Sequence, residues 1–318
     1  MIRLGIIGCG EHSESGHAIS LARFKNAHPN EIELTAACDV KRERAEFFCQ
    51  RYGFLRPYSD ADQMLAQERV DGCIAVVPVE KIPDVGIKLL RLGICCSVEK
   101  PLGASIHDVQ ALLDAARQTQ TPNMVSVNRR FMPFLNRAIE WSAKSGPLRY
   151  VRCTFTRHQR TEPEFLWGTA VHAVDALRYI AGDVAEASIR TLLPVRGGAD
   201  WYAIDLRFNS GVAGRVDVLP TTGVLDETYE LFGEGCRAIV TAPFGFQRGM
   251  RCFQGNELVV EESSEAVPED VLNGCYDEAS AFISALAAKK RPRPSIADVF
   301  PSVELCLQLA RPAAQTKG

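Results

Sequence analysis

Short apolar runs alternate with stretches of helical periodicity through the first part of the chain, and this alternation constrains the fold more than any other feature. The runs with strand character span residues 3–7, 33–38, 72–77, 94–98 and 123–127. Because helical stretches separate these strands, successive strands are expected to run parallel within one sheet. The spacing therefore predicts an α/β fold with a doubly wound parallel sheet and right-handed crossovers.

Beyond Gly146 and Pro147 the pattern changes to consecutive alternating strands. The expected strands span residues 149–158, 185–193, 201–208, 213–219, 228–233 and 236–241. Strands that follow one another without helices form an antiparallel or mixed sheet. A chain of 318 residues exceeds the size at which one core stops growing, so we expect two domains. We place the doubly wound domain over residues 1–122. An α+β domain with an open, mostly antiparallel sheet follows over residues 123–318, and its last helices pack back on one of the domains.

The overall charge and the apolar runs argue against several classes of partner. A net charge of -3 leaves no basic footprint for a nucleic acid. No apolar run approaches the roughly 18 residues of a membrane span, and the N-terminus enters a strand pattern directly. We therefore expect no membrane partner and a cytoplasmic protein. The 11 cysteines are odd in number, lack a Cys-x-x-Cys pair and sit in apolar runs, which is typical of small buried side chains rather than of disulfides.

A glycine turn joins the first strand to a helical stretch. Gly8 and Gly10 stand between them, in the context where amide groups at a helix N-terminus bind a pyrophosphate. Ser13 replaces the third glycine of the usual motif. Asp39 ends the second strand, where a carboxylate accepts hydrogen bonds from the adenosine ribose and repels a 2′-phosphate. We therefore expect a Rossmann domain that prefers NAD to NADP. Lys41 and Arg42 follow immediately and could pair with a phosphate, so NADP stays open, and Asp39 is also typical of a strand-end turn.

The strand at residues 94–98 leads into side chains suited to chemistry. Glu99 and Lys100 follow it, and Pro101 ends the strand because proline cannot donate a ladder hydrogen bond. Ligands bind at the carboxyl ends of strands in open α/β sheets. Lys100 is therefore placed to meet a ligand oxygen.

One helical stretch interrupts the strands of the second domain. His172 and Asp175 are three residues apart and therefore share a face, together with Tyr179. Histidine changes its charge near neutral pH, which suits proton exchange, and the acid on the same face supports that role, with a structural histidine as the alternative. Trp167 and Arg157 offer an aromatic face and a basic group for a sugar ring. Packing and a solvated strand end are the alternatives for these two.

Several of these elements occur together in one known family. They are Gly8-Cys9-Gly10, Val76-Val77-Pro78, Glu99-Lys100-Pro101, Asn128-Arg129-Arg130-Phe131, His172-x-x-Asp175 and the late helix from Tyr276 to Ile283. Along essentially its whole length the chain resembles the glucose-fructose oxidoreductase / inositol dehydrogenase (Gfo/Idh/MocA) family of NAD(P)-dependent oxidoreductases. The resemblance implies a dehydrogenase or reductase that transfers a hydride between a nicotinamide cofactor and a CH–OH group of a sugar, inositol or related polyol. It also implies a homo-oligomer formed through the C-terminal sheet.

The resemblance implies roles for individual residues. Lys100 would contact the nicotinamide side of the cofactor and the reacting oxygen, His172 would be the general acid/base, and Asp175 would assist it. The implied cofactor contacts are Gly8, Gly10, Glu11, His12, Ser13, Asp39, Val77, Pro78, Glu99 and Lys100. The predicted substrate contacts are Asn128, Arg157, Trp167 and His172.

Three departures from the family pattern affect the site. Gly168 stands where members with a working site commonly have an aspartate, so either the acid one turn beyond His172 takes over or the site is slower or differently used. His17-Ala18 arrives one residue late, which predicts a longer phosphate loop in which Glu11 or His12 touches the cofactor. Polar side chains that usually lie near the nicotinamide ribose are missing from the segment after the third strand.

Other functions stay open at this point. A dinucleotide-binding sensor or regulator without turnover fits the missing aspartate, and an NAD-dependent glycosidase would use the same fold. A metal site would need His12, His17, His158 and His172 to converge without a spacing signature, so we expect no metal.

Overall fold

The computed structural model describes residues 1–196 and 198–310 and divides into two compact units. The first unit contains residues 1–128 and 274–300, and the second contains residues 129–273 and the chain from residue 301. The boundary predicted after residue 122 therefore falls too early, because the next strand still belongs to the parallel sheet of the first unit.

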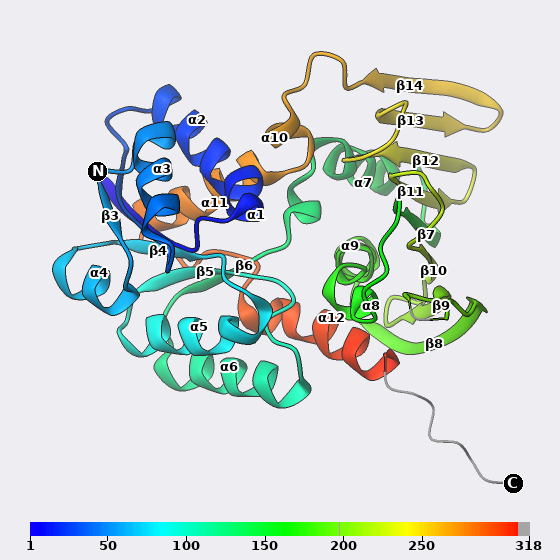
Figure 1. The fold of residues 1–318 in the computed structure, drawn as a ribbon. Coiled ribbons are helices and arrows are strands. Elements are labelled where there is room, and N and C mark those ends of the chain that lie inside the picture. The colour runs from blue at the N-terminus through cyan, green and yellow to red at the C-terminus, as the bar shows by residue number, and fades with distance from the viewer. Residues whose placement is uncertain (197, 311–318) are drawn as a thin grey trace, which may run out of the picture. The chain divides into compact units, whose positions relative to one another are not determined.

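The first unit is built on six parallel strands in the order β3-β2-β1-β4-β5-β6 (Figure 1). The strands are β1 (Ile2–Ile7), β2 (Ile32–Cys38), β3 (Arg56–Tyr58), β4 (Gly72–Ala75), β5 (Cys95–Glu99) and β6 (Asn123–Ser126). The strand order reverses between β1 and β4, so the chain leaves these neighbours toward opposite faces of the sheet. Such a switch point opens a crevice at the carboxyl ends of the two strands, which is where doubly wound proteins bind ligands.

Helices cover both faces of this sheet, which explains why its strands are almost continuously apolar. Figure 1 shows α2, α3 and α11 on one side and α5 and α6 on the other. The helices are α1 (Glu11–Ser13), α2 (Ile19–Ala27), α3 (Arg42–Tyr52), α4 (Ala61–Gln67), α5 (Ile82–Arg91), α6 (Ile106–Thr119) and α11 (Cys275–Ala287), with short 3₁₀ turns η2 (Val79–Lys81) and η3 (Asn128–Phe131). Asp60 and Ser105 cap α4 and α6, because each side chain accepts a hydrogen bond from an amide of the first turn.

The turn after β1 differs from the sequence prediction. A helix begins at Glu11, directly after Gly10, and continues through the π-helical turn η1 (Glu14–Ala18) into α2. The amide of Ile19 donates to the carbonyl of Glu14, five residues back, so the wider turn accommodates the extra residue. The prediction of a longer phosphate loop was therefore wrong, since the insertion lies inside the helix.

The second unit contains an eight-stranded sheet in the order β14-β13-β12-β11-β7-β10-β9-β8, in which only β7 and β10 pair in parallel. The strands are β7 (Leu148–Thr156), β8 (Val184–Leu193), β9 (Trp201–Phe208), β10 (Ala213–Leu219), β11 (Asp226–Gly233), β12 (Cys236–Thr241), β13 (Gly249–Gln254) and β14 (Glu257–Ser263). The mostly antiparallel arrangement confirms the predicted fold class. Strands β13 and β14 were not predicted.

Helices α7 (Pro133–Ser145) and α9 (Val171–Ala181) pack on one face of this sheet. Val151, Cys153 and Phe155 alternate along β7 and are buried, whereas Tyr150 and Arg152 point to the other face and are half-buried. The remaining helices are α8 (Phe165–Gly168), α10 (Glu269–Leu272) and α12 (Ile296–Leu309), the last of which begins in the first unit and continues in the second.

All eleven cysteines are free thiols, and ten of them are buried. No helix within residues 1–196 and 198–310 is both long and apolar enough to cross a membrane.

The glycine after β1 should be indispensable for stability. Gly8 has φ +95°, and a Cβ atom there would lie 1.9 Å from the carbonyl oxygen of Val76. Gly93 has φ +71° but open space around its Cβ position, so it reports the backbone cost alone. We expect Gly93→Ala to lower the free energy of unfolding by about 1 kcal/mol and Gly8→Ala by about 3 kcal/mol in urea denaturation. Equal losses would mean that the contact with Val76 relaxes without cost.

Candidate active site

The predicted glycine turn lies at the switch point of the first unit. The amide of Gly8 donates to the carbonyl of Cys38 at 2.7 Å, and the amide of Val76 donates to the carbonyl of Ile7 at 2.8 Å. The first bond joins the turn to the end of β2, and the second joins the end of β1 to the segment after β4, where Val77 and Pro78 follow directly. Gly10 is extended and immediately precedes the helix that starts at Glu11, so the first amides of that helix face the turn. Four predicted cofactor residues are thus brought together.

Asp39 is held beside this turn by two backbone amides. Its Oδ2 accepts from the amide of Cys9 at 2.8 Å, and its Oδ1 accepts from the amide of Lys41 at 2.9 Å. The carboxylate is buried, and each oxygen keeps a second lone pair that a ribose hydroxyl can use. The geometry fits a ribose ligand, and that role stays a prediction.

Arg44 is a residue that the sequence analysis missed. Its Nη1 lies 4.0 Å from the Cβ position of Gly10, so the guanidinium reaches the glycine turn from α3. Arg42 instead pairs with Glu46, with 2.9 Å between its Nε and the carboxylate. The i,i+4 spacing of Arg42 and Glu46 is a signal in the sequence that predicts an ion pair on the helix surface. With Arg42 paired in this way, Arg44 is the arginine of this turn of the helix that can reach the glycine turn.

Glu99 is buried at the end of β5 and faces two histidines. His17 Nε2 lies 2.7 Å from Glu99 Oε1, and His12 Nε2 lies 3.4 Å from Glu99 Oε2. Burial raises the pKa of Glu99, but His12 and His17 lower it by more, so the net pKa is well below the ordinary value. The carboxylate is therefore ionised and held inside the unit, and Lys100 follows it as a half-buried residue.

The other predicted residues of the first unit have different surroundings. Glu11 is exposed, whereas Ser13 is buried in the first helical turn. The Ser13 hydroxyl has no hydrogen-bond partner among the residues that the structure describes. Asn128 lies at the start of η3, where its Nδ2 is 3.5 Å from the sulfur of Cys275.

His172 and Asp175 occupy the first two turns of α9 in the second unit, and both are buried. Arg130 donates to both carboxylate oxygens of Asp175, from Nε and Nη2 at 2.7 Å each. Ser302 adds a hydroxyl bond of 2.6 Å to Oδ1. The carboxylate of Asp175 is thus engaged by α12 and by the segment before α7, and its predicted help to His172 stays a prediction. Tyr179, expected on the same face, is exposed.

Gly168 stands where members of the family commonly have an aspartate, and the space beside it is open. A Cβ atom built there meets no other atom within 4 Å. Trp167, half-buried, precedes it in the short helix α8. The absence of a side chain at residue 168 is therefore not imposed by packing.

Arg157, predicted to contact substrate, belongs to a buried charge cluster. Arg157 and Arg129 both donate to Glu227 Oε1, at 2.5 and 2.7 Å, and the hydroxyl of Tyr229 donates to Oε2 at 2.9 Å. The guanidinium of Arg157 also lies 3.8 Å from the ring centre of Phe155. Burial lowers the pKa of Arg157. Burial raises the pKa of Glu227, but the two arginines lower it by more. The charge of Arg157 is thus compensated inside the unit, and its contact with substrate stays a prediction.

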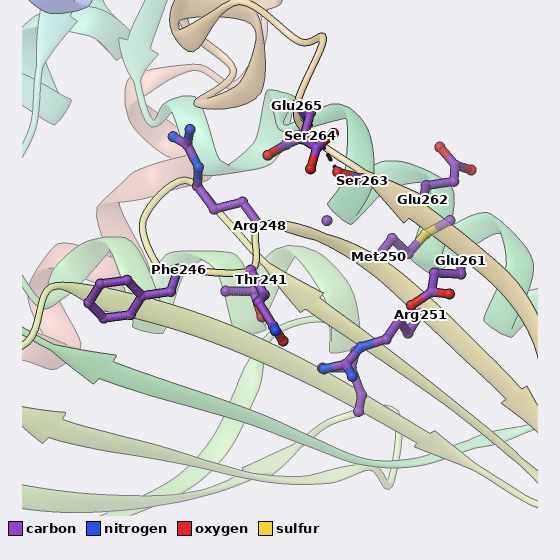
Figure 2. Close-up of a pocket in the computed structure, with 13 residues that line it drawn as sticks. Thr241, Phe246, Arg248, Met250, Arg251, Glu261, Glu262, Ser263, Ser264 and Glu265 are labelled. Atoms are coloured by element: carbon purple, nitrogen blue, oxygen red, sulfur yellow. Dashed lines mark hydrogen bonds between the residues drawn. The ribbon is translucent and has the colours of Figure 1, made fainter.

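A separate pocket of about 400 Å³ lies where β12, β13 and β14 meet the loop before β13 (Figure 2). Its lining carries Arg248 and Glu262, but Arg248 pairs with Glu269 and Glu262 pairs with Arg137, each at 2.6 Å. None of the predicted site residues lines it. Across the described parts of the chain, no three His, Cys, Asp or Glu side chains are grouped so that they could hold a metal ion.

Comparisons with known proteins find an oxidoreductase family model and several dehydrogenases to which this chain is similar. Residues 2–128 match the model of an oxidoreductase family with an NAD-binding Rossmann fold. The 4-carboxy-2-hydroxymuconate-6-semialdehyde dehydrogenase of Sphingobium sp. is 25% identical over 313 residues, which cover 94% of this chain and 95% of that relative. The D-apiose dehydrogenase of Paraburkholderia graminis is 26% identical over 227 residues, which cover 67% of this chain and 59% of the relative. A structure of levoglucosan dehydrogenase in complex with NADH and levoglucosan has the same fold, with a TM-score of 0.80 at 18% identity over 97% of both chains.

The buried cluster around Glu227 predicts a pH dependence of stability. A carboxyl whose pKa is lowered on folding stabilises the protein above its unfolded pKa of about 4.3, and this contribution is lost as the pH falls below that value. Replacing Glu227 by Gln leaves two buried arginines without their anion, so we expect a loss of about 3–5 kcal/mol at pH 7. The difference between wild type and Glu227→Gln should shrink as urea denaturation is repeated at lower pH.

Glu234→Gln is the control, because Glu234 forms an exposed pair with Arg149. It should cost less than about 1 kcal/mol. A cost for Glu227→Gln that stays constant from pH 7 to pH 3 would contradict the assignment of an ionised, paired carboxylate.

Proposed function

Because residues 2–128 match its family model, this chain belongs to the Gfo/Idh/MocA oxidoreductase family, and we propose that it is an NAD(P)-dependent dehydrogenase. The substrate that we propose is a sugar, inositol or related polyol, with hydride transfer between the nicotinamide and a hydroxyl or carbonyl carbon. The observation that carries the proposal is the glycine turn at the switch point, with Asp39 fixed beside it by the amides of Cys9 and Lys41.

The first unit has groups suited to each part of a dinucleotide. The amides after Gly10 suit the pyrophosphate. Asp39 suits the adenosine ribose, and we propose NAD as the preferred cofactor. When bound, the nicotinamide supplies the hydride chemistry.

The protein exchanges the hydroxyl proton and supplies positive charge. We assign His172 as the general acid/base, because oxidation of an alcohol releases a proton and imidazole accepts one near neutral pH. Lys100 provides positive charge where alkoxide character develops. Since Arg130 and Ser302 already engage Asp175, we assign Asp175 to holding Arg130 and α12 in place around His172.

A catalytically silent dinucleotide-binding sensor is the second candidate function, and Gly168 favours it. A Cβ atom at this position would meet no other atom within 4 Å, so packing does not exclude a side chain there, yet residue 168 supplies no carboxylate to orient His172. The two functions differ in one assay: the sensor binds NAD(H) without turnover on any sugar or cyclitol, whereas the dehydrogenase changes the absorbance of the reduced nicotinamide.

The same proposal includes the setting in which the protein works. The eleven free cysteines fit a reducing compartment, which supports a cytoplasmic location. Association into a homo-oligomer through the eight-stranded sheet is part of the proposal as well.

Removal of the imidazole should abolish most of the activity. We expect His172→Ala to lower turnover by roughly 10²–10⁴-fold in a panel of sugars and cyclitols read at the reduced-nicotinamide absorbance. The affinity for NAD should stay within a factor of about two. His107→Ala is the control, since that side chain is 93% exposed on α6. Unchanged turnover in His172→Ala would remove this residue from the mechanism.

Cofactor choice should depend on the charge of Asp39. Asp39→Asn keeps the side-chain shape but loses charged hydrogen bonds worth about 1.5–3 kcal/mol, so we expect the dissociation constant for NAD to rise about tenfold or more. The affinity for NADP should rise, because the repulsion of its 2′-phosphate is removed. Calorimetric titration with both cofactors measures the ratio, and Asp62→Asn on the exposed pair with Lys88 is the control. A ratio that stays the same would show that Asp39 is a turn residue only.

A further inference from the structure

Two histidines of the first helical segment contact one buried carboxylate, that of Glu99 at the end of β5. His17 and Glu99 side chains are each only 6% exposed, and they meet at 2.7 Å, while His12 approaches the second oxygen of Glu99 at 3.4 Å. Strand β4 lies between β1 and β5 in the sheet, so this contact passes from the helix after β1 across the end of β4 to the end of β5. It links two elements that the sheet itself does not pair.

The π-helical turn is what allows both histidines to reach Glu99. Residues five apart in an ordinary α-helix point about 140° away from each other, because each residue turns the helix by about 100°. In a π turn, whose hydrogen bonds join residues five apart, each residue turns the helix by less, so residues five apart lie closer to one face than in an α-helix. The turn at Glu14–Ala18 begins after His12 and contains His17, and the Cε1 atom of His12 lies 3.9 Å from the Cβ position of Gly16. The inserted residue therefore gives Glu99 two partners on one side of the helix.

The burial of this pair makes it a strong constraint on the end of β5. A carboxylate removed from water is costly unless it is paired, so Glu99 has a strong preference for the position that His17 sets. Lys100 is the next residue along the chain, and Pro101 follows it. The backbone that carries the Lys100 side chain is therefore anchored one residue away.

We propose that His12, His17 and Glu99 form a brace that positions Lys100 toward the nicotinamide end of the cofactor. In this proposal His17 and Glu99 are positioning residues, and their effect on the dinucleotide runs through Lys100. The inference rests on the proposed function, because it assumes that the first unit binds NAD(H).

The brace can be tested by comparing NAD⁺ with ADP-ribose, which shares every part of NAD⁺ except the nicotinamide. In calorimetric titrations of the full chain, we expect His17→Phe to raise the dissociation constant for NAD⁺ about tenfold and to change that for ADP-ribose by less than about twofold. His17→Gln, which retains an N–H donor, should recover part of the loss. Should His17→Phe fail to fold, Glu99→Gln removes the charge without leaving a buried carboxylate unpaired, and the same selective loss is expected.

Two further variants separate positioning from support of the helix. In the Lys100→Met background, His17→Phe should cause no additional loss of NAD⁺ affinity, because the two substitutions act through one contact. His28→Phe is the matched control, since it removes an exposed histidine that pairs with Glu31 at 3.0 Å, and it should change neither affinity.

Each other outcome has a definite meaning. Equal losses for NAD⁺ and ADP-ribose, or losses that add to that of Lys100→Met, would show that the cluster only supports the helix and would overturn the brace. Unchanged binding in both His17→Phe and Glu99→Gln would also overturn it while the proposed function stands. A wild-type protein that binds neither ligand would overturn the proposed function, and the brace with it.

Discussion

The close approach of Gly8 to the carbonyl oxygen of Val76 is the constraint on which the first unit depends. With a Cβ position only 1.9 Å from that oxygen, no side chain fits where the chain leaves β1. The absence of a side chain lets the ends of β1 and β4 approach where the strand order reverses, and the bond from the amide of Val76 to the carbonyl of Ile7 holds them there. Asp39 and Arg44 both lie against the turn that results, so the position of the candidate cofactor groups follows from one backbone contact.

The second unit uses a different device, which is the internal compensation of buried charge. Glu227 accepts from Arg129, Arg157 and Tyr229, and Asp175 accepts from Arg130 and Ser302. Removing one partner from such a set leaves a charge in a medium that cannot solvate it, so each set favours the arrangement in which all its partners meet. The helix that carries His172 is therefore held by directional bonds as well as by apolar packing.

Within the second unit, periodicity predicted the strands whose burial alternates regularly. It missed the strands at one edge of the sheet, where most residues of β14 are exposed. Strands β9, β10 and β12 were predicted with the bounds that the structure has, because buried apolar residues alternate along them with positions that include Asp205, Arg215 and Arg237. Strand β14 was missed because most of its residues are exposed and its pairing with β13 supplies the order. In the site, Gly8, Lys100 and His172 carried local signals. Glu227 carried none, since its two arginines lie 98 and 70 residues away along the chain.

The π turn between Gly10 and α2 has a consequence for how such chains are compared. The residues after it still bury Ser20, Leu21 and Phe24 on the face that packs on the unit, so one added residue has left both the glycine turn before it and the apolar face after it intact. A sequence pattern with a fixed spacing from glycine to histidine does not match this chain. Gly10 nevertheless still precedes the helical segment, and His17 still lies within it. Divergence of this kind is visible only when the gap in an alignment is allowed to fall inside a helix.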